Sequence, residues 1–172
     1  MNKKKLKYRV TYLEMNRKPS FDWPKNLKHK LSILLAESFP AWYFLFFYKQ
    51  VGKNYYWTDW LRKSEDEIDE FVHDKNVLLY TLIKDGWPVG FYMLDYRKKD
   101  ICDLSFFGLV DEVIGIGLGK YLLQTAILTA WDSKKIKKLT VNTCSLDHKS
   151  AIYLYQKYGF TPVKYKDLEK TV

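Results

Sequence analysis

Cysteine and histidine, the side chains that most often bind metals or form covalent links, are scarce in this sequence. The chain of 172 residues has two cysteines, Cys102 and Cys144, and their spacing is not that of a CxxC pair. Its three histidines, His29, His73 and His148, are far apart along the sequence. These positions form no zinc motif. Two free thiols in a reducing compartment are the simplest interpretation.

Long apolar segments are absent as well. No run of hydrophobic residues approaches the roughly 20 that a transmembrane helix needs. The N-terminus carries basic residues but lacks the apolar core of a secretory signal. These absences predict a cytoplasmic protein that does not enter a membrane and that holds no metal.

Positive charge exceeds negative charge, and the formal net charge is +9. Much of it falls in three short clusters, at residues 3–5, 97–99 and 134–138. A basic balance suits nucleic acid, an anionic membrane or a polyanionic small ligand. Acidic stretches such as "SEDEIDE" separate the clusters, however, and none forms an extended basic arm. We interpret the clusters as solvated turns and faces rather than as a nucleic-acid site.

Apolar and aromatic residues are abundant, at 47% and 17% of the chain. This content excludes a disordered chain, and the length suits one domain over residues 1–172. Most of the rings are expected to lie in the core. The surplus is expected to line a groove or a contact surface.

Alternation, helical periodicity and turn residues divide the chain into strands and helices. Strands are predicted at residues 8–15, 77–84, 87–96, 100–110, 138–146 and 161–168, and helices at 27–38, 64–73, 118–132 and 148–158. Residues 41–52 fit either a strand or a helix. Asp85 and Gly86 indicate a hairpin turn, Ser64 and Glu67 a capping box, and Gly159 the end of a helix. With no repeat and no linker, the pattern predicts one α/β domain.

A glycine loop, "DEVIGIGLGKYLL" at residues 111–123, joins a predicted strand to a predicted helix, which is where a backbone commonly binds an anion. It is not a dinucleotide fingerprint, because Lys120 stands where the third glycine belongs. It is not a Walker A loop either, because Tyr121 follows the lysine and Ile114 replaces the first glycine. Taken alone, the loop is equally consistent with a tight turn.

A second segment, "AIYLYQKYGF" at residues 151–160, makes the glycine loop more specific. Together with "IGIGLGKYLL" at 114–123, it resembles motifs A and B of the GNAT (Gcn5-related) N-acetyltransferase superfamily. The resemblance covers about residues 77–163, and residues 39–60 also resemble the aromatic N-terminal segment of one GNAT subgroup. It implies a mixed, mostly antiparallel central sheet flanked by helices, with strands that splay apart at the acyl-CoA site.

The resemblance also implies acetyl-CoA as cosubstrate, with its pyrophosphate at the glycine loop. Main-chain N–H groups would bind it, because glycines leave the backbone open and a helix begins at about Leu118. A main-chain N–H near the end of the preceding strand would polarise the thioester. The cofactor-binding residues are therefore predicted to be Leu109, Val110, Gly115, Ile116, Gly117, Leu118, Gly119 and Lys120. Ile114 and Ile116 replace polar family residues, which leaves open a degenerate domain that binds acetyl-CoA poorly.

Acetyl transfer to an amine needs a base for the amine and an acid for the departing thiolate. Alternation along residues 101–109 places Asp103 on a mostly apolar strand face, and its spacing from the loop resembles that of the catalytic glutamate of histone-type members. Asp103 is the predicted base, with Glu112, water or a structural carboxylate as alternatives. Tyr155 occupies the family's tyrosine position and is the predicted acid, with core packing as its alternative.

Three further residues have interpretations that do not require catalysis. Asp147 is expected to cap the following helix. His148 takes the place of an asparagine common in the family and is expected on the surface. Cys144 would allow a ping-pong route, but a cysteine in a strand is more often a small core residue, and direct transfer is the family's norm.

The predicted function is therefore acetyl-CoA-dependent N-acetylation, by direct transfer, of a primary amine on a small molecule, a peptide or a protein. The alternatives are an acyl-CoA-binding regulatory domain without catalysis and a basic nucleic-acid-associated protein. The acceptor is expected to meet aromatic residues near Asp59, whose charge suits a cationic amine. These are Trp42, Tyr43, Tyr55, Tyr56, Trp57 and Trp60. The same rings could instead form a core or the contact of a homodimer.

Overall fold

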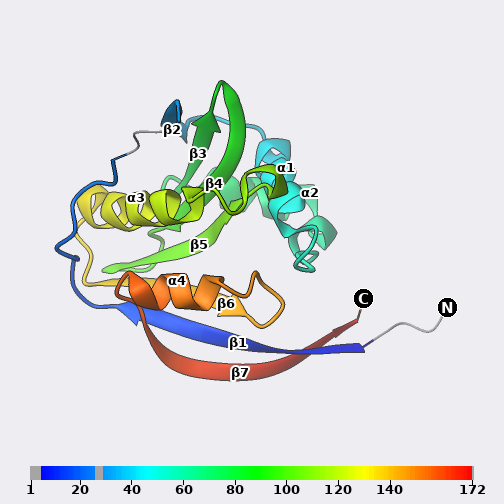
Figure 1. The fold of residues 1–172 in the computed structure, drawn as a ribbon. Helices are drawn as coiled ribbons and strands as arrows, with labels where there is room; N and C mark the ends of the chain where they lie inside the picture. The colour runs from blue at the N-terminus through cyan, green and yellow to red at the C-terminus, as the bar shows by residue number, and fades with distance from the viewer. Residues whose placement is uncertain (1–4, 26–28, 172) are drawn as a thin grey trace.

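A seven-stranded sheet in the order β2-β3-β4-β5-β6-β1-β7 organises the molecule (Figure 1). The computed structural model describes residues 5–25 and 29–171. The strands are β1 Lys5–Met15, β2 Leu31–Ala36, β3 Val77–Lys84, β4 Trp87–Asp95, β5 Ile101–Leu109, β6 Lys138–Cys144 and β7 Thr161–Thr171. All neighbouring strands are antiparallel except β5 and β6. The expected mixed, mostly antiparallel sheet is confirmed.

Helices cover both faces of this sheet (Figure 1). They are α1 Ala41–Gly52, α2 Glu65–Val72, α3 Leu118–Ser133 and α4 Ala151–Lys157, with short 3-10 turns η1 at Trp60–Arg62 and η2 at Asp111–Val113. Helices α1 and α2 share one buried cluster with the sheet, whereas α3 and α4 belong to another. Within the described part of the chain, no helix is long and apolar enough to cross a membrane.

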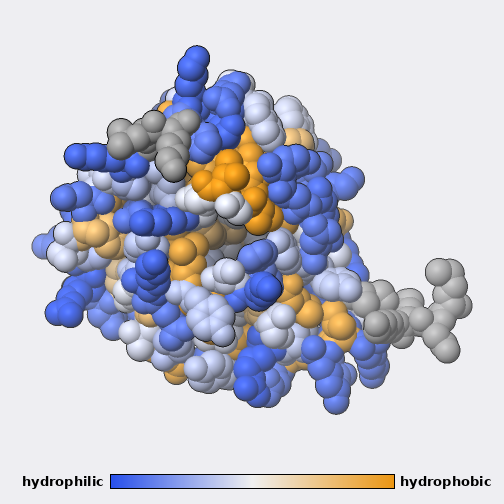
Figure 2. Space-filling view, in the orientation of Figure 1, coloured by the Kyte–Doolittle hydropathy of each residue, from blue (hydrophilic) through white to orange (hydrophobic). Residues whose placement is uncertain are grey.

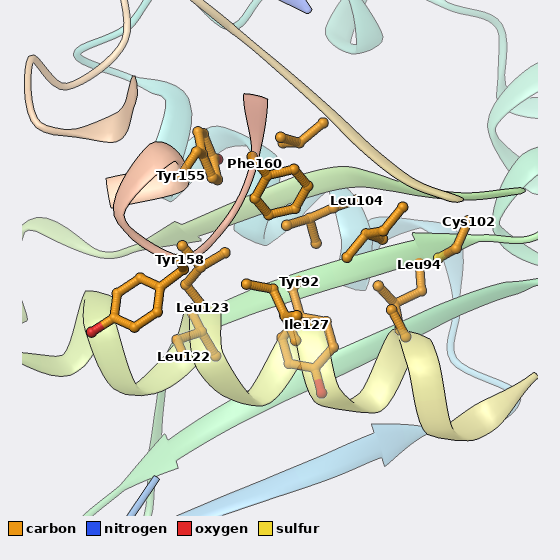
Figure 3. Packing of buried hydrophobic residues seen from close by; sticks show 14 of the residues in the cluster. Tyr92, Leu94, Cys102, Leu104, Leu122, Leu123, Ile127, Tyr155, Tyr158 and Phe160 are labelled. Carbon is orange, nitrogen blue, oxygen red and sulfur yellow. The ribbon is translucent and has the colours of Figure 1, made fainter. Parts of the chain in front are cut away.

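Helix α3 packs through a fully apolar face. Leu122, Leu123 and Ile127 are completely buried in one cluster with Tyr92 and Leu94 of β4, and Ile127 lies beside Tyr92 (Figure 3). Each buried aliphatic side chain of this kind contributes about 1.5–3 kcal/mol relative to an exposed one. This packing holds the start of α3, and with it the glycine loop, in a fixed position over the sheet.

Three local signals of the sequence are confirmed at single-residue detail. Asp85 and Gly86 both have positive φ, 51° and 90°, as a two-residue I′ hairpin turn requires. Ser64 and Glu67 form both hydrogen bonds of the capping box. Gly159, with φ 102°, ends α4 in a Schellman arrangement with N–H···O bonds of 3.1 Å.

One predicted helix is wrong. Residues 31–36 of the segment 27–38 form β2, an edge strand paired with β3; Leu27 and Lys28 lie outside the described residues, as do Lys3 and Lys4 of the first basic cluster. The apolar run "LSILLA" is too short to distinguish helix from strand by periodicity, and pairing with β3 decides it. Residues 41–52, which fitted either state, form α1.

A bulge in β5 changes which residues share a face of the sheet. Met93 of β4 pairs with Phe106, but Leu94 pairs with Leu104, so Ser105 is an extra residue in β5. After the bulge the alternation is shifted by one residue. Phe106 consequently packs in the cluster of α1 and α2.

The expected single face from residue 101 to residue 109 is therefore wrong. Cys102 and Leu104, before the bulge, and Phe107 and Leu109, after it, all pack toward α3 and α4. Asp103 alternates with its neighbours and lies on the opposite face from Phe107.

Candidate active site

A cavity of about 750 Å³ opens where β5 and β6 separate. The two strands pair at only three positions, Ile101–Asp103 with Lys138–Thr140, and diverge beyond them. The glycine loop, α4, β1 and the segment after α1 line the cavity. Figure 2 shows the surface hollowed between α3 and α4, beside apolar surface at the loop that precedes α3. The cavity can therefore hold an elongated ligand across the gap in the sheet.

The glycine loop presents bare backbone to this cavity. Gly115 and Gly117 both have φ of 88°, a conformation that side chains other than glycine's rarely adopt. A Cβ atom at either position would meet no atom within 4 Å, so packing does not require glycine there. Helix α3 begins directly afterwards, and its first N–H groups lack partners within the helix. The arrangement suits an anion bound by backbone groups.

Not all of the predicted cofactor residues line the cavity. Those that do are Leu109, Gly115, Gly117 and Gly119, whereas Val110, Ile116, Leu118 and Lys120 do not. Leu118, the first residue of α3, is buried, and Ile116 is 47% exposed. Ile114 lines the cavity and is 39% exposed, so the position of the family's polar residue does face this space.

Asp111, near the start of the glycine loop, binds two residues that follow α1. Its carboxylate accepts a hydrogen bond of 2.7 Å from Asn54 and forms an ion pair of 3.0 Å with Lys53. The hydrogen bond to Asp111 raises the pKa of Lys53. Because Lys53 and Asn54 follow α1, these contacts connect the glycine loop to the aromatic segment. Glu112, the alternative base, is exposed and does not line the cavity.

Tyr155 of α4 lies in the cavity wall and is 5% exposed. The centroid of its ring lies 6.1 Å from that of Phe107. The ring of Phe160 lies 5.8 Å away (Figure 3). Burial raises the pKa of Tyr155 far above its usual range, and the charges of Asp147 and Asp103 raise it further. Within residues 5–25 and 29–171, no hydrogen bond engages its hydroxyl. The phenol therefore carries its proton at neutral pH, and no acceptor in the described part of the chain competes for that proton.

Asp103 lies at the base of the gap between β5 and β6, in a different environment from Tyr155. Thr140 and Ser105 donate hydrogen bonds of 2.5 Å and 2.8 Å to its two oxygens. It lines a separate cavity of about 600 Å³ and not the larger one. The bulge at Ser105 explains this placement, because it turns the strand after Asp103.

Asp147 has a role that the sequence did not reveal. The expected helix cap is wrong: α4 begins only at Ala151, and no side chain caps it. The Asp147 carboxylate instead accepts hydrogen bonds from the Cys144 N–H at 2.7 Å, the Thr143 hydroxyl at 2.8 Å and the Trp57 indole at 3.1 Å. It thus connects the loop after β6 to the aromatic segment across the cavity mouth.

The aromatic residues predicted near the acceptor divide into two groups. Tyr55, Tyr56, Trp57, Asp59 and Trp60 line the cavity, and we name this segment the aromatic wall. Trp42 is 65% exposed on α1, and the Tyr43 hydroxyl bonds that of Thr81 at 2.9 Å, so neither belongs to it.

His148 and Cys144 also line the cavity. The His148 ring lies 6.3 Å from that of Tyr55, and its side chain is exposed, as expected. Burial raises the pKa of the Cys144 thiol, which disfavours the thiolate that a nucleophile needs.

A sheet that opens beside a glycine-rich helix start, with a buried phenol in the opening, suits a ligand that carries an anionic group such as a phosphate. Residues 36–160 match the acetyltransferase (GNAT) family. This match spans well over half of the chain, and the chain belongs to that family. Members of this family are acyltransferases that bind acyl-CoA and act on an amine-bearing acceptor. A comparison with curated protein sequences finds no match.

Solved structures with the same fold include a GCN5-related N-acetyltransferase from Kribbella flavida (14% identity, TM-score 0.63, 95% of this chain and 57% of that one). A GNAT family acetyltransferase from Elizabethkingia anophelis with acetyl-CoA bound shares 22% identity over 78% of both chains, with a TM-score of 0.56. An IAA acetyltransferase from Bacillus cereus shares 20% identity over 83% of this chain and 100% of its own, with a TM-score of 0.57. Six of the matched chains are longer, and this chain spans 51% to 66% of their length.

Proposed function

We propose that the protein is an acetyl-CoA-dependent N-acetyltransferase that moves the acetyl group directly to a primary amine. One observation carries the proposal: a single cavity contains the glycine loop, the Tyr155 phenol and the aromatic wall. A phosphate site, a proton donor and an acceptor surface thus share one space, as direct transfer requires.

The cofactor would be held mainly by main-chain groups. The N–H groups from Gly115 through Ile116, Gly117, Leu118 and Gly119 to Lys120 would bind the pyrophosphate, with Lys120 as the nearest cation in the loop. Ile116, Leu118 and Lys120 would contribute backbone rather than side chains. Because positions 114 and 116 carry isoleucine, the side chains of the loop itself contribute little positive charge.

The end of β5 supplies the group that would polarise the thioester carbonyl. The Val110 N–H donates to the Val89 carbonyl at 2.9 Å, next to the pair formed by Gly90 and Leu109. In an antiparallel ladder this pattern turns the N–H of Leu109 away from β4, toward the side that β6 has left open. Leu109 is therefore the better donor of the two predicted residues, and Val110 would fix its orientation.

In the proposed reaction the ammonium first loses one proton, for which Asp103 is the proposed base. The neutral amine then attacks the carbonyl carbon, the C–S bond breaks, Tyr155 gives its proton to the sulfur, and the second proton of the nitrogen returns to the Tyr155 oxygen. Because Asp103 lines the neighbouring cavity, it would receive the first proton through water. Glu112 or water alone are the alternatives.

Thiol release from acetyl-CoA, measured across a panel of amines and peptides, tests this function. Calorimetric titration with acetyl-CoA alone separates binding from turnover. We expect saturable binding and amine-dependent release of CoA thiol. Ile114 and Ile116 favour one rival, an acyl-CoA-binding domain without catalysis, and binding with no turnover on any amine would support that rival.

A further inference from the structure

The aromatic wall is fixed at three points and closes one side of the cavity. The Trp57 indole donates to Asp147 at 3.1 Å, and the Trp60 N–H donates to the Tyr48 hydroxyl at 3.3 Å. Lys170 of β7 donates to the carbonyl of Tyr56. The wall is thereby joined to the loop after β6, to α1 and to the last strand of the sheet.

The rings of the wall rest on other rings rather than on flexible chains. Trp57 lies 5.4 Å from Tyr48, and both it and Trp60 lie close to Phe106, at 6.1 Å and 5.9 Å. Tyr56 has a φ of 57°, which a tyrosine adopts only when its surroundings impose it. The wall therefore offers preformed apolar ring faces to whatever enters.

One carboxylate in the cavity is uncommitted. Asp59 is an exposed residue that lines the cavity, and no hydrogen bond or ion pair engages its side chain within the part of the chain that the structure describes. Its charge is felt by Tyr8 and Tyr48, whose pKa values are raised first by burial and then by Asp59. Asp147, the other acid of the cavity, already accepts three hydrogen bonds.

We propose that the acceptor is a small monoamine with an aromatic or bulky apolar body, whose ammonium group is bound by Asp59 and whose body packs on the aromatic wall. This rests on the proposed function. A polypeptide would need backbone partners along a groove, and Lys170 already occupies the Tyr56 carbonyl of the wall. A linear diamine would need a second free carboxylate, and Asp147 is engaged.

Binding of the amine in its charged form is compatible with attack by its neutral form. The charged form of the amine is attracted to Asp59 and to the electron-rich ring faces as it enters. Apolar burial of the body then contributes binding that does not depend on charge. Only after the ammonium loses its proton can the nitrogen attack, as described above.

The test compares acceptors with the full chain and acetyl-CoA. We expect kcat/KM for 2-phenylethylamine to exceed that for butylamine, putrescine and a lysine-containing peptide by roughly tenfold or more. Asp59→Asn should raise KM for 2-phenylethylamine by roughly tenfold while leaving acetyl-CoA affinity unchanged. Asp66→Asn is the matched control, because Asp66 is an exposed acid of α2 outside the cavity.

Each other outcome is decisive. Equal or faster acetylation of the peptide or of putrescine overturns the inference, and so does an Asp59→Asn variant that behaves as Asp66→Asn does. Acetyl-CoA binding without turnover on 2-phenylethylamine also overturns it. Failure of acetyl-CoA to bind in calorimetry overturns instead the proposed function itself.

Discussion

Substituting Gly117 by alanine tests whether the glycine loop binds the pyrophosphate. Gly117 has φ 88° and ψ 0°, and a Cβ there would meet no protein atom within 4 Å. The folded protein therefore has room for the methyl group, and the cost to stability is the backbone conformation alone, about 1–2 kcal/mol. The methyl group would instead occupy the space where a phosphate approaches the backbone.

The chain contains a matched control for that conformational cost. Gly86, in the turn between β3 and β4, has φ 90° and also no atom within 4 Å of a Cβ. Gly86→Ala should lower the unfolding temperature about as much as Gly117→Ala does, because the strain is the same. Only Gly117→Ala should weaken acetyl-CoA binding, by at least roughly tenfold, or about 1.4 kcal/mol.

Calorimetric titration with acetyl-CoA and thermal unfolding of both variants provide the measurement. A charge-assisted hydrogen bond from a backbone N–H contributes about 1.5–3 kcal/mol, so losing one accounts for the expected change. Equal acetyl-CoA affinity in the two folded variants would refute the assignment of the loop.

Three further substitutions address the remaining site residues. Tyr155→Phe should lower the maximal rate by roughly a hundredfold with little change in acetyl-CoA affinity; Tyr158→Phe in the same turn is the control, and equal rates under conditions where chemistry limits turnover would remove the acid role. Asp103→Asn should lower the rate at neutral pH and recover part of it at high pH, where the amine is already neutral; a pH–rate profile like that of the wild type, with unfolding temperature measured alongside, would make Asp103 a structural carboxylate. Ile114→Arg should tighten acetyl-CoA binding by about 1 kcal/mol, because position 114 faces the cavity; calorimetry showing no gain in a folded variant would mean that the phosphates lie elsewhere.

Local sequence signals predicted the parts of the fold that depend on neighbouring residues. The turn at Asp85 and Gly86, the capping box at Ser64 and the helix end at Gly159 each follow from hydrogen bonds within a few residues. The amphipathic pattern of α3 likewise records a single buried face. The glycine loop was found by its position between strand and helix, and the structure places it on the cavity.

Features set by distant pairing could not be predicted in the same way. Residues 31–36 form a strand because they pair with β3 at the edge of the sheet, and no local sequence pattern indicates that pairing. The bulge at Ser105 arises from register with β4, and it moved Asp103 to the face opposite Phe107. The role of Asp147 depends on Trp57, a residue 90 positions away, and only the folded chain brings the two together.

The ladder between β5 and β6 is short, and it separates two parts of the sheet that are each held together by longer ladders. On one side, β2 to β5 are joined by long antiparallel ladders; on the other, β1 is paired along most of its length with β6 and β7. The two halves of the sheet pair at three register positions, and the packing of α3 and α4 and the hydrogen bonds of the aromatic wall to Asp147 and Lys170 also connect them.

Native-state hydrogen exchange should therefore detect two units that open with different free energies, with the boundary after Asp103 and Thr140. A ligand lying in the gap would contact both units, so its binding energy would add to the protection of each. Occupancy of the cavity would then be reported by amide protons in β3 and in the residues of β7 before Lys170, which do not line the cavity.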